Sequence, residues 1–376
     1  MASFDVVIVG GGIMGAFAAG ELGGQGATVA LLDQSVLPNP NAASVDHSKV
    51  FRFAYPDQFY VRLAVDSLKG WRNLENECDL TLLLTSGVIL LSTGEGSFES
   101  DTYHALKSCG LETQLLDAQQ TSTRFPQFDT SGTTFSVFDP SGAVLLAEKS
   151  LRAALDVAIN RGVRIFEHSR VIELRSSRGS VELRTEQGDN LVCAKAIAAA
   201  GPWTRLLLPE LNKRLTTTHQ DVAYFEPAAD RAASFEPNEF PIFIELESGF
   251  YGFPIHHDGA MKIANHHKGA VADPDTDKEG VADGFVDDCR AFFRKSIPGL
   301  ADARVAETRV CFYNNTADDD FIIDWHPDLE GVLIVTGFSG HGFKFGPAIG
   351  RIVADLLLKR RIDFDLDRFR LSRFET

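Results

Sequence analysis

The amino-terminal end of the chain alternates apolar runs with glycine and small residues in a way that predicts strand, turn, helix and strand. Residues 4–9 are a short apolar, β-branched run, residues 13–23 are small and tolerated in a helix, and residues 27–32 are apolar again. Apolar side chains then recur at helical spacing over residues 57–78. Short apolar runs indicate strands, whereas a period near 3.6 indicates an amphipathic helix. We therefore expect a βαβ unit followed by one long helix.

The middle of the chain has a different pattern. Residues 82–140 alternate apolar runs with Gly, Ser, Thr and Pro, which suggests strands and short helices of another layer. A helix is predicted over residues 145–160. Short strands follow it, and the last of them enters a tight turn at Gly201, where glycine lets the backbone approach another group closely.

The carboxyl-terminal part closes the first domain. Residues 215–310 are strand-like with one helical stretch near 282–296. Residues 332–336 predict an apolar strand, and residues 347–358 predict a helix with proline in its first turn, a position that suits it. The two ends of the chain are thus predicted to form one domain, which a second domain interrupts in two pieces.

Composition and charge narrow the class of protein. The 376 residues are 44% hydrophobic and 23% charged, which fits a globular chain of two domains. The formal net charge of −16 argues against nucleic acid or an anionic membrane as a partner, because both would repel the chain. No apolar run approaches the roughly 18 residues that span a bilayer. Five cysteines without CxxC spacing fit free thiols in a reducing compartment, which predicts a cytoplasmic protein.

A glycine motif at the first turn carries the first chemistry. Gly10, Gly12 and Gly15 make G-x-G-x-x-G between a predicted strand and a predicted helix. Such a turn lets the backbone and the helix amino terminus approach a pyrophosphate. Asp33 ends the second strand and would accept hydrogen bonds from the adenosine ribose. The motif fits NAD or FAD, and its place at the extreme amino terminus favours FAD.

Five segments in order resemble the flavin amine oxidases of the D-amino-acid oxidase superfamily. The similar branch holds monomeric sarcosine oxidase, N-methyltryptophan oxidase, pipecolate oxidase and the fructosyl amino acid oxidases. The segments are the glycine motif, residues 48–55 (SKVFRFAY), residues 250–254 (FYGFP) leading to Met261-Lys262, residues 311–313 (CFY) and residues 337–345 (GFSGHGFKF).

The resemblance implies a fold and its division. The fold class is α/β, with a Rossmann-like FAD-binding domain of residues 1–85, 145–214 and 312–376. The inserted substrate domain, with a mixed or antiparallel sheet, comprises residues 86–144 and 215–311.

The resemblance also assigns roles to candidate catalytic and substrate residues. Cys311 matches the cysteine that the family joins to its flavin through a thioether. Lys262 matches the lysine that assists the reaction with oxygen, since a fixed cation stabilises the anion formed. Arg52 and Lys344 match the pair that holds the substrate carboxylate. The alternatives from the residues alone are a buried free thiol for Cys311 and solvated surface charges for the three cations.

The remaining candidates follow from the same match. Tyr251, Tyr313 and His266 match pocket positions, and Lys49 stands where the sarcosine oxidases carry an arginine beside the flavin. The further residues expected to contact the cofactor are Ile13, Met14, Ser48, Lys49, Val171, Gly201, Trp203, Gly337, Gly340, His341, Gly342, Phe343 and Lys344, with the helix after Pro347 directing its amino terminus at the flavin.

One segment departs from the sarcosine oxidase pattern. Ser44-Val45 replaces a histidine pair, and Asp46-His47-Ser48-Lys49 resembles the Asp-x-x-Lys of fructosyl amino acid and pipecolate oxidases. This points away from sarcosine as the substrate and leaves the substrate's side chain open.

We thus predict a monomer or small homo-oligomer that oxidises the C–N bond of an amino acid or secondary amine, giving an imine and H2O2. The alternatives are a flavin dehydrogenase with another electron acceptor and a flavin-binding subunit without turnover. No metal is expected, because the adjacent histidines 256–257 and 266–267 point to opposite faces of a strand.

Overall fold

In the computed structural model, which describes residues 3–177, 179–277 and 280–375, both ends of the chain contribute to one eight-stranded sheet. β1 lies between β2 and β12, parallel to both, and β19 extends the parallel part beside β12. The strands of this first sheet are β1 (Ser3–Val9), β2 (Val29–Leu32), β9 (Arg164–Phe166), β10 (Val171–Ser177), β11 (Ser180–Thr185), β12 (Asn190–Ala198), β18 (Ile322–Trp325) and β19 (Val332–Thr336).

A second sheet of eight strands in the described part of the chain has the order β17-β13-β16-β15-β14-β5-β7-β6. It is antiparallel except where β14 pairs with β5. Its strands are β5 (Val88–Ser92), β6 (Gln114–Asp117), β7 (Phe135–Asp139), β13 (Thr216–Glu226), β14 (Ile242–Ile244), β15 (Phe250–His257), β16 (Ala260–Asn265) and β17 (Arg304–Asn315). A small third sheet holds β3 (Ser48–Phe51), β8 (Ala143–Leu146) and β4 (Leu83–Thr85).

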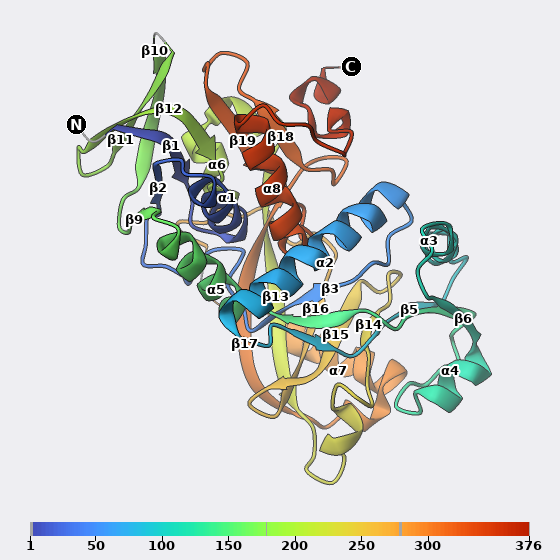
Figure 1. The fold of residues 1–376 in the computed structure, drawn as a ribbon. Helices are drawn as coiled ribbons and strands as arrows, with labels where there is room; N and C mark the ends of the chain where they lie inside the picture. The colour runs from blue at the N-terminus through green and yellow to red at the C-terminus, as the bar shows by residue number, and fades with distance from the viewer. Residues whose placement is uncertain (1–2, 178, 278–279, 376) are drawn as a thin grey trace.

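Helices cover the first sheet and connect it to the second. Figure 1 shows the long helix α2 lying diagonally across the middle of the molecule, between the part with the first sheet and the part with the second. The helices are α1 (Ile13–Gly24), α2 (Gln58–Cys78), α3 (Ser97–Ser108), α4 (Ala118–Arg124), α5 (Ala147–Asn160), α6 (Thr204–Leu207), α7 (Phe285–Ser296) and α8 (Gly346–Leu357). Short 3₁₀ turns η1 (Gly201–Trp203) and η5 (Phe343–Phe345) precede α6 and α8.

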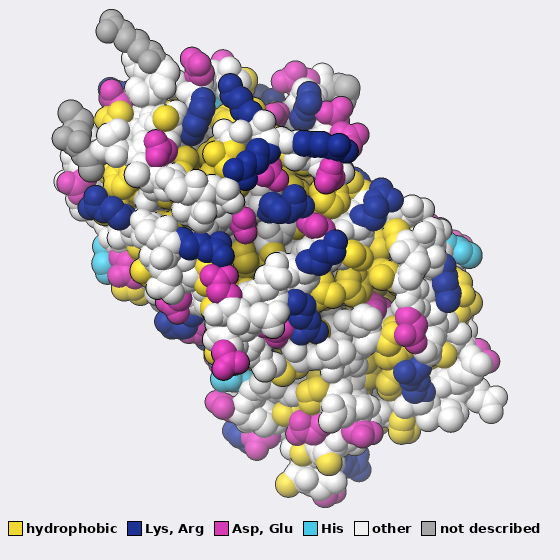
Figure 2. Space-filling model, viewed as in Figure 1, with side chains coloured by type: hydrophobic (Ala, Val, Ile, Leu, Met, Phe, Trp, Pro, Cys, Tyr) yellow, Lys and Arg dark blue, Asp and Glu magenta, His cyan; other side chains and the backbone are white. Residues whose placement is uncertain are grey.

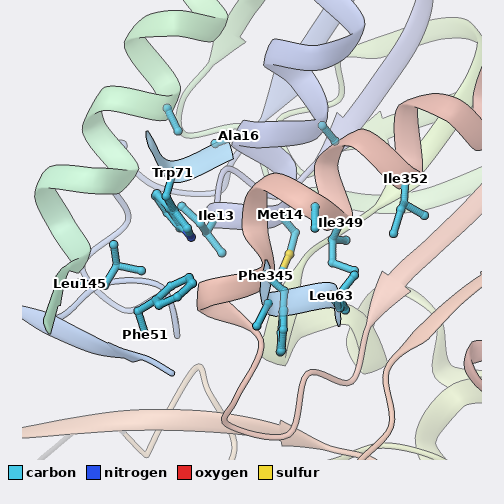
Figure 3. Close-up of a cluster of buried hydrophobic side chains, with 14 of the residues drawn as sticks. Ile13, Met14, Ala16, Phe51, Leu63, Trp71, Leu145, Phe345, Ile349 and Ile352 are labelled. Atoms are coloured by element: carbon cyan, nitrogen blue, oxygen red, sulfur yellow. The ribbon is translucent and has the colours of Figure 1, made fainter. Parts of the chain in front are cut away.

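One hydrophobic core joins segments that are far apart in the sequence. α1 packs against both α5 and α8, and α2 packs against α8. Figure 3 shows Trp71 of α2 and Phe51 of β3 near Ile13 at the start of α1, and Phe345 of η5 near Met14 of the same helix, all within one buried cluster. Burying large aromatic side chains is among the strongest contributions to a core. The amino-terminal turn and the carboxyl-terminal loop are therefore held together by packing.

The predicted fold class is confirmed: an α/β part built on parallel strands carries a second, mostly antiparallel sheet. The domain boundaries stay a prediction, and β8 and β17 run across two of them. Within the described ranges, no helix combines the length and apolar character needed to cross a membrane. On the face shown in Figure 2, Lys and Arg side chains are interspersed with Asp and Glu.

Candidate active site

The turn between β1 and α1 can be built only with glycine at two positions. Gly10 has φ +110°, and a Cβ there would lie 2.3 Å from the carbonyl oxygen of Ala199. A Cβ on Gly15 would lie 1.9 Å from the carbonyl oxygen of Gly10, so Gly15 permits the close contact between helix and strand. Asp33 Oδ2 accepts a hydrogen bond from the backbone N–H of Gly11 at 2.8 Å. Asp33 thus stabilises the turn, a role additional to the ribose contact that the sequence predicts for it.

This turn forms one end of a large cavity. It contains about 1370 Å³ of empty space, part of which is open to solvent. The predicted cofactor residues that line it are Gly10, Gly12, Ile13, Met14, Asp33, Lys49, Val171, Gly201, Trp203, Cys311, Gly337, Gly340, Gly342 and Phe343. The cavity therefore runs from the glycine turn to the carboxyl-terminal loop, as an extended dinucleotide requires.

Four predicted cofactor residues do not line this cavity. Gly15 lies against the carbonyl oxygen of Gly10 and not in the cavity wall. The backbone oxygen of Ser48 accepts a hydrogen bond from Lys262 Nζ at 2.9 Å. His341 and Lys344 lie on the side of the loop that faces Tyr55. Any contact of these four with the cofactor stays a prediction.

Cys311 and Lys49 meet inside the cavity. Cys311 is in β17 and is 9% exposed, and Lys49 is in β3. Lys49 Nζ lies 3.6 Å from Cys311 Sγ. Burial would lower the pKa of Lys49, but the sulfur of Cys311 and the Asp46 carboxylate raise it above its usual range. The two side chains therefore lie in direct contact at the cavity wall.

A buried carboxylate organises the cations around it. Asp46 Oδ2 accepts a hydrogen bond from Lys262 Nζ at 2.5 Å, and Asp46 Oδ1 accepts one from Tyr224 Oη at 2.6 Å. Lys49 Nζ lies 3.6 Å from Asp46 Oδ2. Burial would raise the pKa of Asp46, but the ammonium groups of Lys262 and Lys49 hold it well below its usual range. Asp46 is therefore an anion shared by two lysines.

Lys262 is a buried cation with a fixed position. It is 1% exposed, which excludes the alternative of a solvated edge charge. Met261 and Ile263 belong to the hydrophobic core on the other face of β16. Burial lowers the pKa of Lys262, and the Asp46 carboxylate opposes this shift. The ammonium group is thus retained in a dry site because Asp46 is there.

A second pair of cations lies near the carboxyl-terminal loop. Lys344 is 4% exposed, and its Nζ donates to Tyr55 Oη at 2.9 Å and to the backbone oxygen of His341 at 2.6 Å. The guanidinium carbon of Arg52 lies 4.1 Å from the centroid of the Tyr55 ring. Arg52 Nη1 is buried and has no hydrogen-bond partner in the described residues. Burial and the Arg52 charge hold the pKa of Lys344 well below its usual range.

Aromatic side chains lie between these two charged groups. Tyr251 Oη and Tyr313 Oη are 3.4 Å apart, and burial raises the pKa of both phenols. The His266 ring lies 6.1 Å from the Tyr313 ring, between centroids. Burial and the nearby Arg52 charge lower the pKa of His266 to about 4, so its imidazole is neutral at physiological pH. The region between the cations is apolar in character and carries few charges of its own.

Some residues of the site were not predicted from the sequence. Asp46 and Tyr224 are 178 positions apart, and Tyr55 supports Lys344 from 289 positions away. A buried polar side chain needs a partner, but sequence spacing does not say which. The one available signal is the Asp-x-x-Lys spacing, which places Asp46 near Lys49 without indicating Lys262.

One group of potential metal ligands lies beside this site. In the described part of the chain, His47, His257 and Glu307 bring ligand atoms within 4.8 Å of one another. The two imidazole rings are stacked, with centroids 3.5 Å apart and planes at 21°. An ion lies in the ring plane of each imidazole that binds it, and two nearly parallel planes do not meet at one ion. The absence of a metal stays a prediction.

Comparison with known proteins identifies the family. The model of the family described as "FAD dependent oxidoreductase" matches residues 5–356. The chain is 33% identical to monomeric sarcosine oxidase of Bacillus sp. (strain B-0618), over 98% of this chain and 96% of that protein. It is 32% identical to N-methyl-L-tryptophan oxidase of Escherichia coli O139:H28, over 99% of this chain and all of that protein.

Solved structures agree on the fold. The structure of L-proline dehydrogenase from P. horikoshii superposes with a TM-score of 0.88, at 20% identity and over 99% of this chain and 97% of that one. The cavity residues fit the FAD that this family binds, because only glycine is accommodated at the turn between β1 and α1 and because both that turn and the carboxyl-terminal loop line one cavity. The chain therefore belongs to the FAD-dependent oxidoreductases and is an FAD enzyme.

Proposed function

We propose that the chain oxidises the C–N bond of an amino acid or of a secondary amine that carries a carboxylate. The observation that carries the proposal is the pair Arg52 and Lys344. Both side chains are turned inward, neither forms an ion pair with a carboxylate in the described residues, and Arg52 Nη1 has no partner. Lys344 is buried and Arg52 is half-buried with one buried nitrogen that has no partner, and cationic groups held away from water without an ion pair are unfavourable. A substrate carboxylate supplies an anion and two charge-assisted hydrogen bonds.

The relatives' names support the reaction type. Monomeric sarcosine oxidase and N-methyl-L-tryptophan oxidase are named for N-alkyl amino acids, and this chain aligns with both over nearly its whole length. FAD, when bound, would supply the acceptor for a hydride equivalent (two electrons and a proton) from the carbon attached to the nitrogen, whose lone pair then completes the C=N bond. The protein's part is to hold the carboxylate at Arg52 and Lys344 and to place the amine among Tyr251, Tyr313 and His266. His266 and the two phenols are uncharged. They therefore provide no anion that would stabilise the protonated form of the amine, and the unprotonated form can bind among them.

Oxygen is the proposed electron acceptor, and H2O2 the second product. Lys262 is the buried cation that favours electron transfer to O2, since the transfer creates an anion. We further propose a cytoplasmic monomer or small homo-oligomer, because free cysteines and a net charge of −16 fit that setting.

Peroxide release across matched pairs of compounds tests the proposal. N-alkyl, cyclic and glycated amino acids are each compared with the same compound in which an amide replaces the carboxylate. We expect peroxide from at least one amino acid and at least about 100-fold less from its amide, because a neutral amide leaves the two cations unpaired. Equal peroxide from an amino acid and its amide would show that the carboxylate is not recognised.

The flavin is proposed to be joined to Cys311 through a thioether. The supporting observation is the 3.6 Å contact of Cys311 Sγ with Lys49 Nζ inside the cavity. Acid precipitation of the native protein should leave the yellow colour in the pellet. Cys311→Ala should release it into the supernatant, whereas Cys193→Ala, which changes a buried thiol outside the cavity, should not. Colour in the supernatant of the native protein contradicts the link.

A further inference from the structure

Asp275 makes a contact between the second sheet and the wall of the FAD cavity. It lies in the loop that connects β16 to α7. Its Oδ1 accepts a hydrogen bond from Trp203 Nε1 at 2.7 Å, and its Oδ2 accepts one from Arg170 Nη2 at 2.7 Å. Trp203 and Arg170 both line the cavity. One carboxylate thus holds two lining residues at once.

The two lining residues come from neighbouring segments that are far apart in the sequence, since β10 and α6, which follow them, pack against each other. Arg170 directly precedes β10, and Trp203 ends η1, the turn that follows β12. Ile172 and Leu206 neighbour them in sequence, also line the cavity, and are each 41% exposed. Exposed lining residues mark where a cavity opens to solvent. Asp275 therefore holds two lining residues in place beside that opening.

The loop that carries Asp275 is itself anchored to the second sheet. The backbone N–H of His219 in β13 donates to the backbone oxygen of Ala270 at 2.9 Å, and Ala272 N–H donates to the backbone oxygen of Thr217 at 3.0 Å. Asp273 Oδ1 accepts from the backbone N–H of Asp275 at 2.9 Å, which fixes the turn. The carboxylate is thus presented from a paired backbone and not from a free tip.

We propose that Asp275 is a cofactor-retention residue: by holding Arg170 and Trp203 together at the mouth of the cavity, it slows the release of FAD. The Arg170 bond is charge-assisted and the Trp203 bond involves a buried indole, so moving either lining side chain out of place requires its bond to Asp275 to break. Asp275 acts through its two partners and not on the reacting atoms. The inference rests on FAD binding alone and is independent of the proposed substrate.

The test measures FAD dissociation in the Cys311→Ala background, where no thioether can form. After dilution, the fluorescence of released FAD gives the dissociation rate. Asp275→Ala should raise this rate about tenfold, which corresponds to roughly 1.4 kcal/mol. Asp275→Asn keeps an acceptor for Trp203 but loses the ion pair, so its rate should be intermediate. Asp283→Ala, an exposed residue of the same loop, should leave the rate unchanged.

A cycle with the partners separates retention from general destabilisation. If Asp275 acts through Arg170 and Trp203, adding Asp275→Ala to Arg170→Gln plus Trp203→Phe should raise the rate no further. The proposal is overturned if the FAD dissociation rates of Asp275→Ala and Asp275→Asn are both within twofold of the rate of the parent Cys311→Ala protein. It is also overturned if the effect of Asp275→Ala remains in full when both partners are replaced, because the residue would then act by another route.

Discussion

Replacing Arg52 with methionine should slow the anaerobic reduction of the bound flavin by a carboxylate-bearing amine about 100- to 1,000-fold, because losing one partner of a buried charge pair costs about 3–4 kcal/mol. Methionine keeps much of the side-chain volume but offers no donor. Lys344→Met should have an effect of the same order, since Lys344 Nζ is the second buried donor at this point. Rapid mixing under nitrogen, followed by flavin absorbance, measures both.

The controls for this prediction use exposed cations of the same types. Arg62→Met on α2 and Lys149→Met on α5 should reduce the flavin at the native rate. A second comparison uses the substrate: the amide analogue should already be slow with the native protein, and Arg52→Met should slow it little further. If Arg52→Met slows the acid and the amide by the same factor, the side chain has a structural role and does not bind the carboxylate.

Replacing Asp46 with asparagine should lower the free energy of unfolding at pH 7 by about 3–5 kcal/mol, because it leaves Lys262 buried without its anion. The double variant Asp46→Asn with Lys262→Met should recover part of this loss, since the more deeply buried of the two lysine charges is then removed together with the anion. Asp66→Asn, which breaks an ion pair of Arg351 on the surface, is the matched control and should cost less than about 1 kcal/mol. Chemical unfolding measures all three variants.

The same ion pair predicts a dependence on pH. The folded-state pKa of Asp46 is depressed, so its contribution is present above the unfolded pKa near 4 and is lost as pH falls below that value. The difference in stability between native protein and Asp46→Asn should therefore shrink in acid. A difference that stays constant from pH 7 to pH 3 would contradict a charged Asp46.

Asp46 should also control the reaction with oxygen through Lys262. Without the carboxylate, the main effect that opposes burial is gone, so the pKa of Lys262 falls further and its proton is lost at lower pH. Reoxidation of the reduced flavin in Asp46→Asn should then slow as pH rises, whereas the native rate stays flat over the same range. Lys262→Met should be slow at every pH. Identical pH profiles of flavin reoxidation in native protein and Asp46→Asn would show that Asp46 does not control the reaction with oxygen.

Local pattern predicts the elements that depend on near neighbours. The predicted helix over residues 57–78 is observed as Gln58–Cys78, and the strand over residues 4–9 as Ser3–Val9, because hydrophobic spacing in each window decides the element. The long strand Arg304–Asn315, which carries Cys311, is predicted only as part of a strand-like region that ends at residue 310. Polar and apolar side chains are mixed on both of its faces, and its pairing with β13 is a long-range contact.

The candidate site divides in the same way. The glycine turn depends on one short segment, so its residues can be found from spacing, and the structure adds the collisions that exclude any other residue at Gly10. The cluster of Asp46, Lys262 and Tyr224 forms only when the loop before β3 lies against β16 and β13. Its assembly follows from tertiary packing, and no periodicity within a single segment reports it.

Anaerobic mixing of the purified yellow protein with the amino acid panel tests the central claim most directly. The account predicts that at least one carboxylate-bearing amine bleaches the flavin under nitrogen, that its amide does so far more slowly, and that air restores the colour with release of peroxide. A flavin that stays oxidised with every amine of the panel would contradict the proposed activity. A flavin that is bleached but stays reduced in air would retain the amine chemistry and contradict oxygen as the acceptor.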